Sequence, residues 1–190
     1  GNLTKNAAST LTLSGANTYT GTTTVNAGTL AIGNTMTIGA ITGSGNLSLG
    51  NGFTLTTNST SDSTFSGVIS GSGALSKNGS STLTLSGNNT YSGATTISAG
   101  TIEIGAAGRL GAGSYAQNIT NNGTLIYSGT NAQTLSGIIS GSGALTQNAS
   151  STLTLSGANT YTGTTTVNAG TLAIGNTMTI GAITGSGNLS

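Results

Sequence analysis

The chain lacks cysteine, proline, histidine and tryptophan, and it has only three basic and two acidic residues among 190. Without cysteine there is no disulfide framework. Without imidazole or thiolate, most acid–base, nucleophilic and metal-binding chemistry has no side chain to carry it. Three scattered cations also fall short of a surface that binds phosphates. We therefore predict no enzyme, no catalytic residue, no cofactor or metal, and no nucleic-acid partner.

Long apolar runs are absent as well, so we expect no segment of this chain to insert into a membrane. The lack of proline and cysteine suits a protein that is exported unfolded, because neither slow X-Pro isomerisation nor early cross-linking can delay its folding. We therefore expect an exported, extracellular protein.

Glycine is abundant, with 33 copies, and internal repetition dominates the sequence. The segment Ser9–Ser48 recurs unchanged as Ser151–Ser190, and a diverged copy fills Ser81–Gly105. The unit is therefore about 142 residues long, with two halves of about 72 and about 70 residues between copies of the same leucine. We interpret residues 1–190 as one continuous repeat segment and expect it to be a fragment of a longer array, because neither end carries a distinct capping sequence.

Alternation of polar and apolar residues is the local signal. Thr10–Ser14, Thr29–Gly33 and Gly52–Thr56 each place apolar side chains at every second position, which is typical of a half-buried strand. Gly, Asn and Ser punctuate these strands and tolerate tight turns. The sequence therefore predicts an all-β protein.

Strand spacing selects among all-β folds. The intervals that separate Leu11, Leu30 and Phe53 recur unchanged between Leu83, Ile102 and Leu125. We interpret this as a parallel β-solenoid of about eight coils of ~24 residues, rising about 29 Å per long unit. A twisted antiparallel sandwich is the competing interpretation, but it would not predict equal spacings in both halves.

Each coil has few large side chains to bury. We expect an inward column formed by the apolar residues of the alternating segments, namely Leu11, Leu13, Leu30, Ile32, Phe53, Leu55 and their counterparts. One coil alone cannot offset its backbone entropy, so stability should accumulate only as coils stack.

Leu3–Gly33 resembles the autotransporter-associated β-strand repeat of bacterial passenger domains. The matching features are Gly-x-Leu-Thr/Ser-Lys, Thr-Leu-Thr-Leu-Ser-Gly, Asn-Thr-Tyr-Thr/Ser-Gly and Thr-Thr-x-x-x-Gly-Thr-Leu. They return in Leu75–Gly105, with Ile102 in place of the last leucine, and in Leu145–Gly175. The third copy departs from the pattern, with Gln147 where the others have Lys5 and Lys77. The resemblance implies a right-handed parallel β-helix displayed outside an outer membrane.

Several residues could be considered as sites. Asp62 lies in a Ser-rich turn, and Glu103 should face outward between two isoleucines, so we interpret both as solvated charges. Tyr19, Tyr91 and Tyr161 recur too far apart to stack on one another, and we expect them to brace turns. Sequons for N-glycosylation occur at Asn2, Asn46, Asn58, Asn78, Asn88, Asn118, Asn122, Asn148 and Asn188, as expected by chance in a chain rich in Asn, Ser and Thr.

We thus predict a non-enzymatic structural segment of an extracellular bacterial fibre or passenger stalk, able to associate with itself end to end or laterally. The alternative is an adhesin that binds itself or cell-surface glycans. Ice binding and a carbohydrate-active β-helix enzyme are further alternatives. Alignment of Thr12 with Ala31 and of Thr84 with Glu103 argues against a flat threonine surface for ice.

Overall fold

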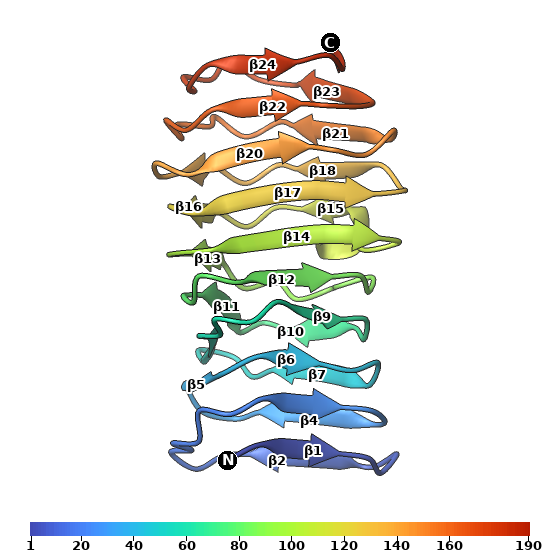
Figure 1. The fold of residues 1–190 in the computed structure, drawn as a ribbon, viewed down its shortest axis with the longest axis vertical. Helices are drawn as coiled ribbons and strands as arrows, with labels where there is room; N and C mark the ends of the chain where they lie inside the picture. The colour runs from blue at the N-terminus through green and yellow to red at the C-terminus, as the bar shows by residue number, and fades with distance from the viewer.

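The computed structural model describes residues 1–190 and is a right-handed parallel β-solenoid, as predicted (Figure 1). The nearer strands run to the right and the farther strands return to the left while the chain rises, which defines a right-handed path (Figure 1). Every paired strand is parallel to its neighbour, and the chain contains no helix that could span a bilayer.

The strands of the solenoid lie on three faces, which the chain follows in the same order and which we call face 1, face 2 and face 3. The first turn and the turns after residue 140 have no strand on face 3, and the turn through residues 86–94 has none on face 2. Face 1 consists of β1 (Leu3–Lys5), β3 (Thr23–Val25), β6 (Ile41–Thr42), β9 (Ser63–Phe65), β12 (Thr82–Leu85), β14 (Thr101–Ala106), β17 (Thr124–Gly129), β20 (Ala144–Gln147), β22 (Thr165–Val167) and β24 (Ile183–Gly185). Face 2 consists of β2 (Thr10–Leu13), β4 (Thr29–Ile32), β7 (Asn46–Leu49), β10 (Ile69–Gly71), β15 (Ser114–Tyr115), β18 (Gln133–Leu135), β21 (Thr152–Leu155), β23 (Thr171–Ile174) and β25 (Asn188–Leu189). Face 3 consists of β5 (Met36–Ile38), β8 (Thr54–Thr57), β11 (Ala74–Lys77), β13 (Thr95–Ile97), β16 (Ile119–Asn121) and β19 (Ile139–Ser140). A short 3₁₀ helix, η1 (Gly111–Gly113), precedes β15.

The predicted number and length of the coils were slightly wrong. The solenoid has about nine turns, where the sequence predicted about eight. Nine steps along face 1 carry the chain from Leu3 to Ile183, so each turn takes about 20 residues on average, fewer than the predicted ~24 residues. The path from Leu3 to Leu145 takes seven of these turns, so the long repeat unit rises roughly 34 Å at the spacing of β-strands.

The coil length was overestimated because some strands are too short to show alternating polar and apolar residues. Leu30 pairs with Leu47 on the next turn and not with Phe53, while Leu55 pairs with Leu75. Strands such as Ile41–Thr42 and Met36–Ile38 have only one or two inward side chains, so their sequence carries no period-2 pattern. The predicted partners Leu11 with Leu30, and Leu83 with Ile102, are confirmed.

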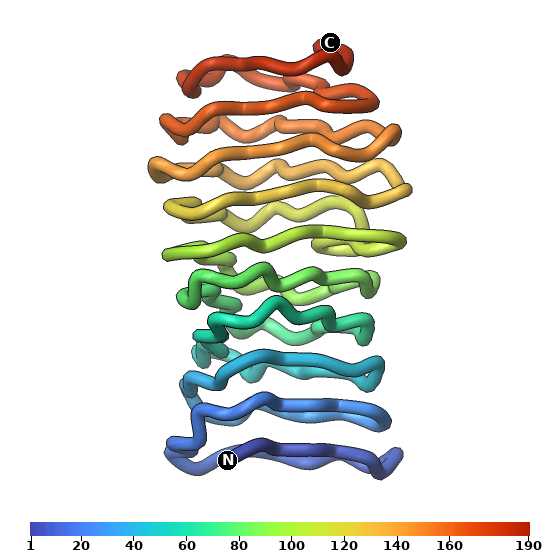
Figure 2. The backbone as a smooth tube through the Cα atoms, in the orientation of Figure 1, coloured from blue at the N-terminus to red at the C-terminus, as the bar shows by residue number.

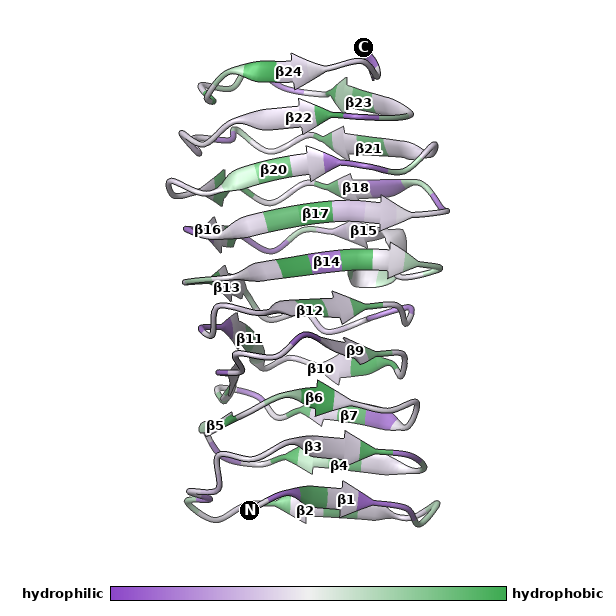
Figure 3. Cartoon of the chain, viewed as in Figure 1, coloured by the Kyte–Doolittle hydropathy of each residue, from purple (hydrophilic) through white to green (hydrophobic).

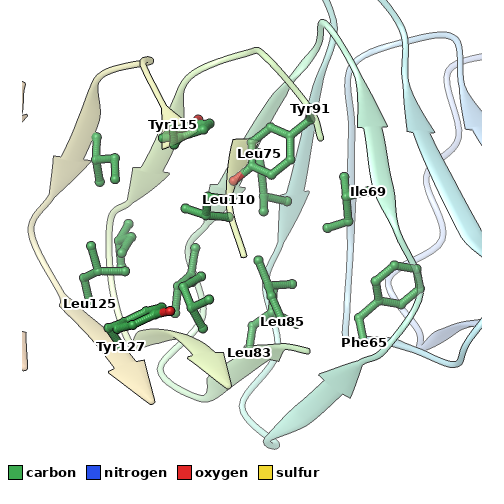
Figure 4. Close-up of a cluster of buried hydrophobic side chains, with 14 of the residues drawn as sticks. Phe65, Ile69, Leu75, Leu83, Leu85, Tyr91, Leu110, Tyr115, Leu125 and Tyr127 are labelled. Carbon is green, nitrogen blue, oxygen red and sulfur yellow. The ribbon is translucent and has the colours of Figure 1, made fainter. Parts of the chain in front are cut away.

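The core is one continuous column of 32 buried residues that runs the length of the solenoid. Apolar residues recur in every turn between more polar ones (Figure 3), and those of the central turns point into the shared interior (Figure 4). Of the side chains predicted to lie inside, Leu30, Ile32 and Leu55 are buried, Leu13 and Phe53 are only half-buried, and Leu11 is exposed.

The three copies of the repeat do not lie on the same face. Thr10–Leu13 and Thr152–Leu155 lie on face 2, whereas the matching Thr82–Leu85 lies on face 1. This follows from the turn length, because the long repeat unit makes seven whole turns but each half makes a fractional number. The turns around residues 100–150 also reach further outward than those before them (Figure 2). They include the longest steps, such as the one from Thr95 to Ile119.

Candidate functional site

Outward hydroxyl groups form columns along the faces of the solenoid. On face 1, ten aligned positions form one column, and eight of them are threonine: Thr4, Thr24, Thr42, Thr64, Thr84, Glu103, Ile126, Thr146, Thr166 and Thr184. On face 3, all six aligned positions carry a hydroxyl: Thr37, Thr56, Ser76, Thr96, Thr120 and Ser140. Successive hydroxyls lie one strand spacing apart, so these columns offer regular, uncharged hydrogen-bonding surfaces.

The column on face 1 is interrupted where the sequence predicted. Thr84 pairs with Glu103, and Thr12 pairs with Ala31 on face 2. Glu103 faces outward between the buried Ile102 and Ile104, and the Thr84 hydroxyl lies 3.5 Å from its carboxylate. A charged side chain and Ile126 therefore separate two threonine tracts.

Inside the solenoid, the structure places a lysine that sequence reasoning left unassigned. Lys77 is 1% exposed, and its ammonium donates to the carbonyl of Gly79 in the corner between faces 3 and 1. Lys5 is also buried and donates to the carbonyls of Ala7 and Ala27, the latter at 3.2 Å. Burial lowers the pKa of Lys77, and the nearby Asp62 charge opposes that shift.

Gln147 occupies the same position in the third repeat and is fully buried. Its amide donates to the carbonyls of Ala149 and Ser151 at 3.2 and 2.7 Å, while its Oε1 atom has no partner. The corner thus needs a donor for its inward carbonyls, and either an ammonium or an amide supplies it. The sequence does hold a signal for this burial. Lys77 follows Leu75 by two residues in the same strand, so both side chains point to the interior.

A glycine closes each of these corners. Gly100 has a φ of +68°, and a Cβ there would clash with the Gly79 carbonyl oxygen and lie 2.9 Å from the Lys77 ammonium. Any side chain would therefore displace the capped corner, which explains why Gly28, Gly100 and Gly170 align in the repeats.

The repeated tyrosines brace turns, as predicted. Tyr19, Tyr91 and Tyr161 each share a hydrogen bond with the threonine four residues later, with oxygen separations of 2.9, 2.7 and 2.6 Å. Sequence reasoning missed that Thr95 also bonds the hydroxyl of Tyr115, whose ring lies 5.6 Å from that of Tyr91. Burial raises the pKa of Tyr91 well above its ordinary value and that of Tyr115 to about 12.

Buried asparagines cap the turns next to these tyrosines. Asn89 is fully buried, accepts the N–H of Ile69 at 2.9 Å and donates to the carbonyl of Gly87. Asn159 accepts the N–H of Ile139 in the equivalent turn. Exposed asparagines form short ladders as well, with Asn26 donating to Asn6 at 2.7 Å.

The two carboxylates do not converge. Asp62 accepts the N–H of Thr82 at the start of the next turn, and Glu103 lies on the turn after that. They are two turns apart, roughly 10 Å along the axis. No three acidic, histidine or cysteine side chains gather anywhere in the chain.

Comparison with known proteins agrees with the resemblance noted in the sequence. The family model described as the passenger-associated-transport-repeat matches residues 3–32, 75–104 and 145–174. The chain is 42% identical over 156 residues to a protein named "Adhesin BmaC autotransporter" from Brucella suis biovar 1 (strain 1330). That match covers 73% of this chain but only 4% of the relative. No solved structure matches the chain.

Proposed function

Because the chain carries three passenger-associated transport repeats, we propose that it is a stiff, non-enzymatic stalk segment of a bacterial autotransporter passenger, exposed on the cell surface or secreted. The relative is named as an autotransporter adhesin, and this chain corresponds to a small part of such a protein. In that setting the segment would project other parts of the passenger away from the cell.

The observation that supports this role is the unbroken core of 32 residues through about nine turns. No turn has a core of its own, and the hydrogen-bond ladders on the faces run along the axis. Bending the rod would stretch the ladder on one face and compress the packing on another, so stiffness follows from the same contacts that give stability.

A non-enzymatic role is favoured by the chemistry of the surface. Asp62 and Glu103 are separated by two turns, whereas glycoside hydrolysis uses two carboxylates flanking one bond. The remaining surface is dominated by neutral hydroxyl and amide groups.

Stiffness can be measured directly, because the chain has no native cysteine to compete with spin labels. Labels on Thr24→Cys and Thr166→Cys would lie seven turns apart on face 1, roughly 34 Å. We expect a narrow distance distribution near that value by pulsed electron paramagnetic resonance. A broad distribution, like that of the same pair in guanidinium chloride, would contradict a rigid stalk.

The second candidate is an adhesin that acts through its hydroxyl columns, and the threonine tracts of face 1 favour it. Such a neutral surface could associate laterally with a second copy or with a neutral glycan. Beads bearing the segment should then aggregate, and the triple variant Thr24→Lys, Thr64→Lys and Thr166→Lys should not. Dispersed wild-type beads, without and with added glycans, would remove this candidate and leave the stalk intact.

A further inference from the structure

We infer that Asn51–Gly52 is a site of spontaneous deamidation, and that the fold leaves its backbone free to move while it holds the backbone of the other two Asn-Gly pairs in place. The chain has three such pairs, Asn51–Gly52, Asn78–Gly79 and Asn122–Gly123. Asparagine is thermolabile, and a following glycine has no Cβ to hinder attack by its own nitrogen.

The reaction needs only water as co-reactant. The backbone nitrogen of Gly52 attacks Cγ of Asn51, so that a nitrogen–carbon bond forms, the bond to the side-chain nitrogen breaks and ammonia leaves with the displaced proton. Water then opens the cyclic imide at either carbonyl, which yields aspartate or isoaspartate. No oxidant, metal or enzyme takes part.

Asn51–Gly52 meets the geometric requirements of this reaction. The pair forms the tip of the turn between β7 and β8, both residues are exposed, and neither N–H makes a backbone hydrogen bond. A Cβ added to Gly52 would meet nothing within 4 Å, and its φ is +76°. The side-chain contact of Asn51 is a 3.4 Å hydrogen bond from the exposed Ser72 hydroxyl to Oδ1. The turn is therefore free to rotate into the attacking geometry.

The Asn78–Gly79 pair is held against the preceding turn. Asn78 and Gly79 both donate to the carbonyl of Thr57, and Gly79 is buried so closely that a Cβ there would clash with the Ser59 carbonyl oxygen. Rotation there would also disturb the ammonium of Lys77.

Asn122 is held at both its backbone and its side chain. Its backbone N–H donates to the carbonyl of Ile97 at 2.7 Å, and its Oδ1 accepts the N–H of Ser142 on the following turn. The Gly100 carbonyl oxygen packs where a Cβ on Gly123 would lie. Cyclisation at either of these two pairs requires local unfolding of the solenoid.

Deamidation would change the electrostatics of this segment. The formal net charge is +1, with only two carboxylates, so one new carboxylate brings the segment to neutrality. A net charge near zero favours association, so the segment should become more prone to self-association as it ages.

The test is to incubate the folded protein for several weeks at physiological temperature and mildly alkaline pH, and to follow each pair by peptide mapping and mass spectrometry. We expect the Asn51 peptide to gain about one dalton, with both aspartate and isoaspartate products, on the order of tenfold faster than the other two peptides. The variant Asn51→Gln should remove the product at that site and leave the two slow sites unchanged.

The same incubation in guanidinium chloride distinguishes the effect of the fold on the deamidation rates from the effect of the local sequence. The three pairs should then convert at similar rates, because the solenoid no longer protects two of them. If the native protein converts all three pairs at similar rates, or if Asn51 keeps the same advantage when unfolded, the inference is wrong.

Discussion

Leu11 and Leu153 are the same residue of the same repeated sequence, yet Leu11 is 37% exposed and Leu153 is fully buried. Leu153 lies between Gln133 of the turn below and Leu172 of the turn above, whereas Leu11 has only Leu30 above it. The other end shows the converse, because Leu47 is buried while its copy Leu189 is 56% exposed. Burial in this fold is therefore supplied by the neighbouring turn and not by local sequence.

Truncation of Leu11 and of Leu153 should therefore lower the free energy of unfolding by different amounts. Leu153→Ala removes a side chain packed on both sides and should lower the free energy of unfolding by about 2–5 kcal/mol. Leu11→Ala, in an identical local sequence, should cost below about 1 kcal/mol. Urea unfolding of both variants checks this, and equal shifts in the midpoint would contradict the stacked origin of burial.

Lys77 should be replaceable by the residue that the third repeat uses. Lys77→Gln keeps a donor for the Gly79 carbonyl, as Gln147 donates to the equivalent Ala149 carbonyl, and should leave the unfolding midpoint nearly unchanged. Lys77→Met removes the donor and should cost about 1–3 kcal/mol, as expected for an unsatisfied buried carbonyl. An equal loss of stability in both variants would show that the charge, and not the hydrogen bond, stabilises this corner.

The sequence was sufficient for the fold but not for its turn length or its interior. Thr10–Leu13 and Thr82–Leu85 alternate along their whole length, so both the strands and their partners could be predicted. Ile41–Thr42 places a single side chain inside, and no periodicity marks it as a strand. Lys77 is unexpected in a core because lysine is rarely buried, and its place depends on carbonyl groups that only the folded corner brings together.

Alkaline pH should destabilise the wild-type solenoid through its buried phenols. The folded-state pKa of Tyr115 is raised to about 12 from 10.0, so the folded protein holds its proton where the unfolded chain has released it. This stabilising contribution is complete below pH 10 and is lost as the pH rises through about 12. Ultraviolet titration of phenolate should show delayed ionisation that disappears in guanidinium chloride, and a single ordinary transition in the folded protein would contradict it.

A polypeptide of residues 1–190 in isolation should associate through its two end coils. Leu11 is exposed at one end, Ile183 and Leu189 at the other, and the end strands leave backbone groups unpaired. Light scattering should detect association that grows with concentration, and the double variant Ile183→Lys and Leu189→Lys should reduce it. A monomeric wild type at all concentrations would contradict end-to-end association.

A repeat should fold equally well whichever face it begins on. Deleting the 70 residues that separate equivalent positions of the second and third repeats tests this. Removing residues 75–144 joins Ala74 to Leu145, so the third repeat would take face 3 where the second repeat began. Leu145 then replaces Leu75 in the same inward position, and Gln147 replaces Lys77 in the corner. Because the second repeat already occupies these faces in the native chain, the shortened protein should keep its strand content by circular dichroism and unfold cooperatively.

Removing residues 75–139 is the matched control for that deletion, because it changes the register of the chain by an odd number of positions. Ser140 would then take the inward position of Leu75, and the side chains of the following strand would point to the wrong side. This control should lose its cooperative transition, since the apolar column would be interrupted at the junction. If it folds as well as the first deletion, register does not govern the stacking of this solenoid.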